Sequence, residues 1–139
     1  MVNAQKDYLC TEQLKYMKKV KEETEILLET ILEGINNLKG KNIKLIDLES
    51  IKHTECSYFI ICHGTSSTHV DSIARSVEST VKEKLKTDVW HRDGYRNAYW
   101  ILLDYGDIMV HVFQQEARDF YNLEDLWADA KIKTIAETE

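Results

Sequence analysis

The chain of 139 residues has no proline, few glycines, only three cysteines and no long apolar run. A membrane helix needs about 20 consecutive apolar residues, so no membrane-spanning segment is expected. Cys10, Cys56 and Cys62 are too few and too irregularly spaced for a disulfide framework, which favours reduced thiols. The first residues, MVNAQKDYLCTEQ, lack a signal-peptide pattern and contain acids that transit peptides avoid. The expected location is therefore cytoplasmic.

Acidic residues concentrate at one end of the chain. Hydrophobic residues make up 43% and charged residues 30%, which is typical of one globular domain at this length. Residues 104–139 contain nine acidic and three basic residues, net −6, against −1 for residues 1–40 and +1 for residues 41–103. This acidic third repels phosphates, so we expect no direct DNA binding. It favours a basic partner, and a solvated acidic tail is the alternative.

The first half of the chain predicts two helices around two strands. Apolar residues recur at helical spacing between 25 and 38, and Gly40 is a plausible end for that helix. The charged segment before it, KYMKKVKEETE, either extends the helix or stays mobile. A short strand is expected at 42–48, and the apolar run at 56–64 predicts a buried central strand. The turn Gly64–Ser67 then opens the second helix, whose apolar residues recur at helical spacing: Val70, Ile73, Ala74, Val77, Val81 and Leu85.

The second half predicts three strands and a helical end. A short strand and turn are expected within 87–94, strands at 99–104 and 107–113, and one or two helices from 115 to 132. The order α-β-β-α-β-β-β-α predicts an α/β (α+β) domain. Its core is expected to be a single mixed β-sheet flanked by helices.

The stretch WILLDYGDIMVHVF, residues 100–113, predicts a hairpin with the two-residue turn Tyr105–Gly106. Asp104 then lies opposite Asp107, a like-charge pair that a metal, a cationic partner or plain solvation could offset. Strand side chains alternate between faces. The expected core face comprises Tyr99, Ile101, Leu103, Ile108, Val110 and Val112. The mixed face comprises Trp100, Leu102, Asp104, Asp107, Met109, His111 and Phe113. Either the C-terminal helices or a partner cover this mixed face.

No metal site and no thiol chemistry are expected from the histidines and cysteines. Five of them cluster within 17 residues, but their spacing matches no paired-ligand pattern: His53, Cys56, Cys62, His63 and His69. The adjacent Cys62 and His63 point to opposite faces of a strand. Nothing indicates a lowered pKa of the Cys62 thiol, so Cys56 and Cys62 are interpreted as buried thiols.

The Gly64–Ser67 turn between a strand and a helix could hold an anion with its backbone N–H groups, and helix capping is the alternative. No lysine follows as in a P-loop. Nucleotidyl transfer would also need a carboxylate pair after this turn. Asp47 and Glu49 precede it, and the hairpin turn splits Asp104 from Asp107. We therefore expect no catalytic residues, no cofactor and no metal.

Four segments together resemble the ribosomal silencing factors, also called the Iojap family. They are LKGKNIKLIDL, SYFIICHGTSSTHV, WILLDYGDIMVHVF and ARDFYNLEDLWADA, within about residues 25–131. The last two segments are highly specific, because ten residues stand where the family pattern requires them: Trp100, Asp104, Gly106, Asp107, His111, Arg118, Tyr121, Leu123, Glu124 and Trp127. Ser57 and Thr68 depart from the pattern, which has Asp and a basic residue there.

The resemblance implies a nucleotidyltransferase-like fold without known catalysis. It implies binding to the large ribosomal subunit through large-subunit ribosomal protein fourteen, at the subunit interface. The bound factor would block the small subunit and repress translation when nutrients are scarce. Organelle relatives are linked to large-subunit assembly. The implied organisation is an N-terminal extension (1–24), helical or mobile, a family domain (25–131) and a C-terminal tail (132–139).

The mixed hairpin face is the expected docking surface. Trp100 is its expected apolar anchor, flanked by Leu102 and Met109, although a Trp packed under its own C-terminal helix is the alternative. Tyr105 is expected at the turn tip, in contact with the partner. Trp127 is expected in the core.

Charged groups complete this expected interface. The carboxylates of Asp104, Asp107 and Glu116 are expected to pair with lysine or arginine of the ribosomal protein. Arg118 and Tyr121 either contact the partner or lock the C-terminal helix onto the sheet. Two other functions stay open, a large-subunit assembly factor and a nucleotide-binding nucleotidyltransferase-like enzyme. The oligomeric state also stays open, with a homodimer among the alternatives.

Overall fold

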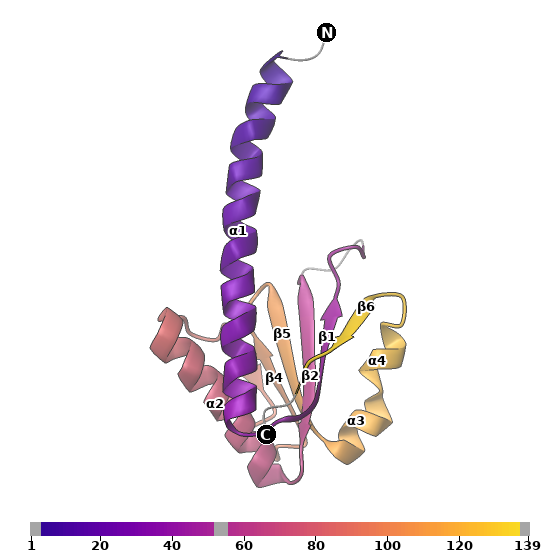
Figure 1. The fold of residues 1–139 in the computed structure, drawn as a ribbon. Helices are drawn as coiled ribbons and strands as arrows, with labels where there is room; N and C mark the ends of the chain where they lie inside the picture. The colour runs from indigo at the N-terminus through magenta and orange to yellow at the C-terminus, as the bar shows by residue number, and fades with distance from the viewer. Residues whose placement is uncertain (1–3, 52–55, 137–139) are drawn as a thin grey trace.

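The longest element of the computed structural model is a helix that rises far beyond the sheet (Figure 1). The structure describes residues 4–51 and 56–136. Helix α1 spans Ala4–Asn37, so the charged segment before residue 25 extends the helix. The second half of α1 packs on the sheet through the fully buried Ile31 and Ile35. The helix ends at Asn37, and a turn follows up to Gly40, whose N–H donates to the Ile35 carbonyl at 3.0 Å.

One six-stranded mixed sheet forms the centre of the fold, which confirms the expected α+β class. The strands are β1 (Lys41–Asp47), β2 (Tyr58–Gly64), β3 (His91–Asp93), β4 (Trp100–Asp104), β5 (Ile108–Gln114) and β6 (Lys131–Thr134). Their order is β3-β4-β5-β2-β1-β6, with β2 and β5 parallel and the other neighbours antiparallel. A parallel pair needs a long crossover, and helix α2 (Ser67–Leu85) lies within it.

The main core lies between one face of the sheet and the helices α1 and α2 (Figure 1). Helix α2 contributes an apolar stripe at helical spacing, as the sequence predicts: Val70, Ile73, Ala74, Val77 and Val81. The strands contribute the alternate residues of each run: Ile43, Ile60, Cys62, Ile101, Leu103, Ile108, Val110 and Val112. All of these side chains are fully buried.

The opposite face of the sheet is covered only in part. Helices α3 (Gln115–Tyr121) and α4 (Leu123–Leu126) lie there and close a smaller apolar cluster. Its buried members are Ile46, Leu48, Ile61, Phe113, Ala117 and Ala130. Helix α3 contacts β5 and β2. On β4, the alternate side chains on this face stay half-buried, so this end of the face remains accessible.

The β4–β5 hairpin differs from the predicted one in register. Its loop is Gly106–Asp107, because the Tyr105 N–H donates to the Ile108 carbonyl at 2.9 Å, and Asp104 pairs with Met109. Gly106 has a φ of +89°, which suits the first loop position of a type II′ turn. The expected pairing of Asp104 with Asp107 is therefore wrong. The shift is two residues, an even number, so the strand residues keep their predicted faces.

Strand β6 is an element that the sequence did not predict. Its residues 131–134 pair antiparallel with β1 at the edge of the sheet, and the Lys44 amine donates to the Thr134 hydroxyl at 2.6 Å. All four residues of β6 are exposed. Without a buried alternate residue, KIKT lacks the apolar alternation that identifies a strand, and its two lysines are typical of a protected edge.

Candidate functional site

Trp100 lies half-buried within a series of aromatic rings on the partly covered face. Its ring centroid is 5.0 Å from that of Phe113 and 4.8 Å from that of Tyr121 on α3. The indole N–H donates to Nδ1 of His111 at 3.1 Å. Neighbouring rings and this hydrogen bond therefore hold Trp100 in one orientation, while part of its surface stays accessible.

Exposed apolar residues continue this surface onto α3. Phe120 is 78% exposed and Tyr121 is 45% exposed, and their ring centroids are 5.1 Å apart. Leu102 and Met109 are half-buried on β4 and β5. We call the resulting surface the docking face: Trp100, Leu102, Asp104, Met109, Phe120 and Tyr121. Phe120 was not among the residues predicted for this surface, although its position beside Tyr121 in helical sequence was a usable signal.

Arg118 holds the C-terminal helices onto the sheet. Its side chain is 6% exposed, and Nε and Nη2 both donate to one carboxylate oxygen of Glu124, at 2.9 and 2.6 Å. Nη1 donates to Nδ1 of His63 at 2.9 Å. These bonds join α3, α4 and β2. Of the two roles expected for Arg118, these bonds favour the one in which it holds the C-terminal helix on the sheet. The exposed Tyr121 lies beside Trp100 on the docking face.

The two carboxylates of the hairpin point to different places. Asp104 is half-buried on the docking face, and its carboxylate accepts from the Gly106 N–H at 2.8 Å. Asp107 is exposed, and its carboxylate lies 3.3 Å from the hydroxyl of Thr24 on α1. The expected placement of both carboxylates on one face is therefore wrong, because Asp107 occupies the second loop position instead of a strand position.

Three further residues had expected places in the interface or the core: Tyr105, Glu116 and Trp127. Tyr105 was expected at the turn tip, but it is 6% exposed within the main core, because it pairs with Ile108 on the core face. Burial raises its pKa. Glu116 is exposed at the start of α3. Trp127 is half-buried against the smaller cluster, with its ring 5.6 Å from that of Phe59.

Two buried titratable groups are held in their neutral forms. Burial lowers the pKa of His111 to about 4, so its imidazole is neutral at physiological pH and can accept the Trp100 indole hydrogen. Burial raises the pKa of the Cys62 thiol to about 12. A thiol with a raised pKa is a poor nucleophile, which supports the interpretation of Cys62 as a structural residue.

The Gly64–Ser67 turn makes the hydrogen bonds of a helix cap. Ser66 is the N-cap of α2, and its hydroxyl accepts from the His69 N–H at 3.1 Å. The Thr65 N–H donates to Nδ1 of His69 at 2.9 Å. A Cβ at Gly64 would lie 2.9 Å from the backbone nitrogen of Val70. Close packing and capping thus account for the glycine and the serine of this turn.

Within the described ranges 4–51 and 56–136, no three His, Cys, Asp or Glu side chains form a group that could hold a metal ion. His53, one of the five clustered histidines and cysteines, lies outside those ranges. Among the same residues, no helix has the length and apolar character needed to cross a bilayer.

The fold and this surface define a class of α+β domains with one six-stranded mixed sheet and one partly uncovered sheet face. A family model described as "Ribosomal silencing factor during starvation" matches residues 21–139. The chain belongs to this family, which confirms the resemblance drawn from its motifs.

Several relatives and solved structures are similar to the chain. Ribosomal silencing factor RsfS of Bacillus subtilis is 36% identical over 109 residues, 78% of this chain and 91% of the relative. The mitochondrial Iojap-related protein of Arabidopsis thaliana is 31% identical over 76% of this chain and 59% of its own length. Crystal structures from Chromobacterium violaceum and Bacillus halodurans have TM-scores of 0.71 and 0.67 at 28% and 30% identity. They cover 81% of this chain, and 92% and 98% of their own chains.

Proposed function

We propose that this chain binds the large ribosomal subunit through large-subunit ribosomal protein fourteen and thereby blocks the small subunit. The observation that carries the proposal is the docking face. Half-buried Trp100, Leu102 and Met109 lie together on neighbouring strands that α3 leaves accessible. A preorganised aromatic residue amid apolar neighbours is the usual anchor of a protein interface, commonly worth about 2 kcal/mol or more.

Charge supports a basic partner for this face. Asp104 lies within the docking face, Glu116 is exposed at the start of α3, and the last third of the chain has a net charge of −6. Ribosomal proteins are mostly basic, so complementary potentials would steer the encounter and fix its orientation. Translation would fall because the bound chain occupies the surface that the small subunit needs.

Co-sedimentation of the purified chain with large subunits, small subunits and intact ribosomes tests this proposal. We expect binding to large subunits and none to intact ribosomes. Trp100→Ala is expected to weaken that binding at least about tenfold. Met109→Glu is a second variant that leaves the Trp100–His111 hydrogen bond in place. Circular dichroism should show that both variants keep the fold.

Trp90→Ala is the matched control, because Trp90 is 79% exposed and its ring lies against the hairpin turn at Gly106, apart from the aromatic rings around Trp100. Equal losses for Trp90→Ala and Trp100→Ala, or no binding to any particle, would overturn the proposal. A chain that binds large subunits without reducing their joining to small subunits would act instead as an assembly factor. Magnesium-dependent nucleotide binding would favour the enzyme alternative.

A further inference from the structure

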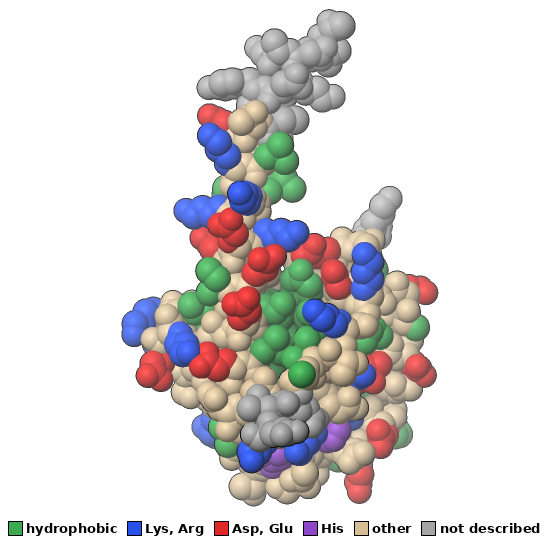
Figure 2. All heavy atoms as spheres, in the orientation of Figure 1, with side chains coloured by type: hydrophobic (Ala, Val, Ile, Leu, Met, Phe, Trp, Pro, Cys, Tyr) green, Lys and Arg blue, Asp and Glu red, His purple; other side chains and the backbone are tan. Residues whose placement is uncertain are grey.

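The projecting part of α1 is basic, although the chain as a whole is acidic. Residues 11–21, TEQLKYMKKVK, contain four lysines and one glutamate, a net charge of +3, against −6 for the whole chain. We call this segment the basic arm. Every residue from 11 to 23 is exposed, and Figure 2 shows basic side chains around the helix above the body of the molecule. The arm therefore presents a positive potential to the solvent.

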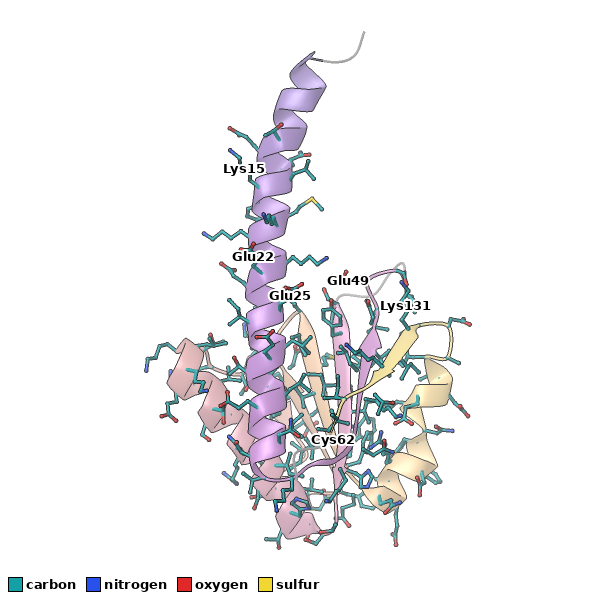
Figure 3. The ribbon with its side chains drawn as sticks, in the orientation of Figure 1. Lys15, Glu22, Glu25, Glu49, Cys62 and Lys131 are labelled. Carbon is teal, nitrogen blue, oxygen red and sulfur yellow. The ribbon has the colours of Figure 1, made fainter. Side chains whose placement is uncertain are left out.

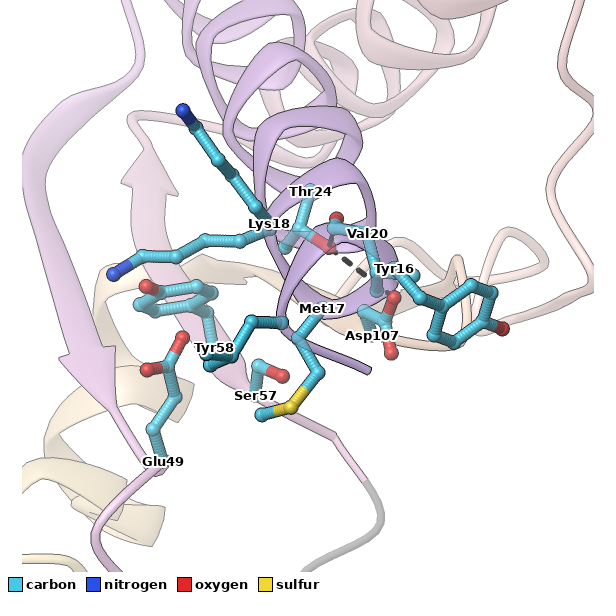
Figure 4. Close-up of a pocket in the computed structure, with 11 residues that line it drawn as sticks. Tyr16, Met17, Lys18, Val20, Thr24, Glu49, Ser57, Tyr58 and Asp107 are labelled. Atoms are coloured by element: carbon cyan, nitrogen blue, oxygen red, sulfur yellow. Dashed lines mark hydrogen bonds between the residues drawn. The ribbon is translucent and has the colours of Figure 1, made fainter. Parts of the chain in front are cut away.

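The base of the arm is held to the sheet at Thr24. This residue is 8% exposed, and its hydroxyl lies 3.3 Å from the carboxylate of Asp107 in the hairpin loop (Figure 4). The helix continues from there without a break to Ala4. At about 1.5 Å per residue, Lys15 lies roughly 14 Å beyond Thr24. This distance exceeds the Debye length of about 8 Å at physiological salt, so the charge of the acidic C-terminal third is largely screened at Lys15.

Three lysines of the arm occupy one side of the helix. Lys15, Lys18 and Lys19 follow the spacing of three and four that places side chains on a common face. Met17 lies about 160° around the helix from Lys15, and Figure 4 shows it above Ser57, which precedes β2. Figure 3 shows Lys15 far out on the projecting helix. The lysine side is thus turned away from the side of the arm that faces the sheet.

The arm lysines have no ion-pair partner among the side chains that the structure describes. Acidic residues follow them at a spacing of four: Glu22, Glu23 and Glu25. A glutamate on the C-terminal side of a lysine is the weaker order for a helical ion pair. By contrast, the amine of Lys84 on α2 lies 2.6 Å from a carboxylate oxygen of Glu33. The arm lysines are therefore available to the negative charges of a partner.

An exposed aromatic ring lies beside these lysines. Tyr16 is 70% exposed, and it is three residues from Lys19, a spacing that makes two side chains neighbours on a helix. Proteins that bind single-stranded nucleic acid combine these two elements. Basic side chains follow the phosphates, and aromatic rings stack on the unpaired bases. The side chains of the arm therefore fit single-stranded nucleic acid.

We propose that the basic arm binds single-stranded RNA of the large ribosomal subunit, with the lysines on phosphates and Tyr16 stacked on a base. The inference rests on the proposed function for the source of that RNA. A membrane-bound helix would need its apolar side in the lipid, whereas the side that carries Leu14 and Met17 is turned toward the body of this chain. The family model begins at residue 21, so most of the arm is an addition to the domain that carries the docking face.

Fluorescence anisotropy of the full chain with a labelled oligouridylate tests the charge contacts. Lys15→Gln with Lys19→Gln should make the slope of log K against log salt shallower by about 1.4 and weaken binding about tenfold at 0.15 M salt, because each phosphate contact on a single strand adds about −0.7. Glutamine is as good a helix former as lysine, so circular dichroism should show an unchanged helix. Lys131→Gln with Lys133→Gln makes the same charge change at exposed positions of β6. This matched control should keep the wild-type slope.

Substitution of Tyr16 tests the stacking separately. Tyr16→Ala should weaken binding at least about fivefold and leave the salt slope unchanged, because the ring carries no charge. Tyr16→Phe keeps the ring and should bind as the wild type does. A wild-type chain that does not bind the oligouridylate, or equal losses in the arm and β6 variants, would overturn the proposal. Binding to anionic lipid vesicles with none to RNA would overturn it in favour of a membrane.

A photoreactive benzophenone amino acid in place of Tyr16 tests the source of the RNA. Irradiation of the full chain bound to large subunits should cross-link it to ribosomal RNA, and ribonuclease should release it. Cross-links to protein alone would overturn the proposal without affecting the docking face. Trp100→Ala should weaken binding to large subunits and leave the affinity for the oligouridylate unchanged. A chain that binds the oligouridylate but no subunit would refute the proposed function, and with it the large subunit as the source of the RNA.

Discussion

Mild acidification should destabilise the fold through His111 and loosen the docking face with it. The imidazole is 5% exposed in β5, and burial lowers its pKa from 6.5 to about 4. Nδ1 accepts the indole hydrogen of Trp100, and Nε2 has no hydrogen-bond partner among the described residues. A second proton on the ring would occupy Nδ1, the atom that accepts from Trp100.

The sign and size of this effect follow from the two pKa values. Below pH 6.5 the unfolded chain takes up a proton at His111, whereas the folded chain resists it until about pH 4. The unfolded state therefore binds more protons in this window, and the free energy of unfolding falls as the pH falls. One pKa unit corresponds to about 1.4 kcal/mol, so the loss between pH 7.5 and pH 5 is roughly 2 kcal/mol.

Urea denaturation at pH 7.5 and pH 5 measures this loss. His111→Asn is the comparison, because an asparagine oxygen lies near the position of Nδ1 and can still accept from Trp100. Carboxylates titrate in both proteins, so the difference between their pH dependences isolates His111. The wild type should lose roughly 2 kcal/mol more than the variant. Equal losses would refute the reasoning, since they would mean that the buried ring takes up its proton as easily as the unfolded one.

Two further predictions concern charged residues. Arg118→Ala should lower the free energy of unfolding, measured in urea, by about 2–3 kcal/mol, because Glu124, whose side chain is 29% exposed, and His63 each lose a hydrogen bond. A change under about 0.5 kcal/mol would contradict the role of Arg118 in holding the C-terminal helices onto the sheet. Asp104→Asn should weaken large-subunit binding most at low salt, whereas Asp107→Asn, which faces α1, should leave it unchanged. Equal effects of the two variants in co-sedimentation would contradict this separation.

Local patterns in the sequence predicted most helices and strands correctly. They failed where the sequence fits two turn types equally well, or where a strand has no pattern of its own. Helical spacing located α2, and alternation located both faces of β4 and β5. The hairpin register was missed because Gly106 can occupy either loop position, in a type I′ or a type II′ turn. Strand β6 is defined only by its pairing with β1, and its four exposed residues show no alternation of apolar and polar side chains that would predict a strand. Tyr105 was misplaced as a direct consequence of the register.

The candidate site was predictable for its strands and less so for its helices. Alternation along β4 identified Trp100, Leu102 and Asp104, because a strand residue's face depends only on its parity. The role of Arg118 could not be chosen from the sequence, since it depends on Glu124 and His63, which approach it from α4 and β2. Contacts between elements of this kind follow from tertiary packing and leave no spacing pattern.

The two sheet faces explain why this chain can carry two separate surfaces. The family model begins at residue 21, so it includes the docking face and excludes the exposed Leu14 and Met17. Helix α1 is continuous from Ala4 to Asn37, and its buried end fixes the direction of its projecting end. The main core, which also packs against β4, therefore sets the direction of the projecting part of α1.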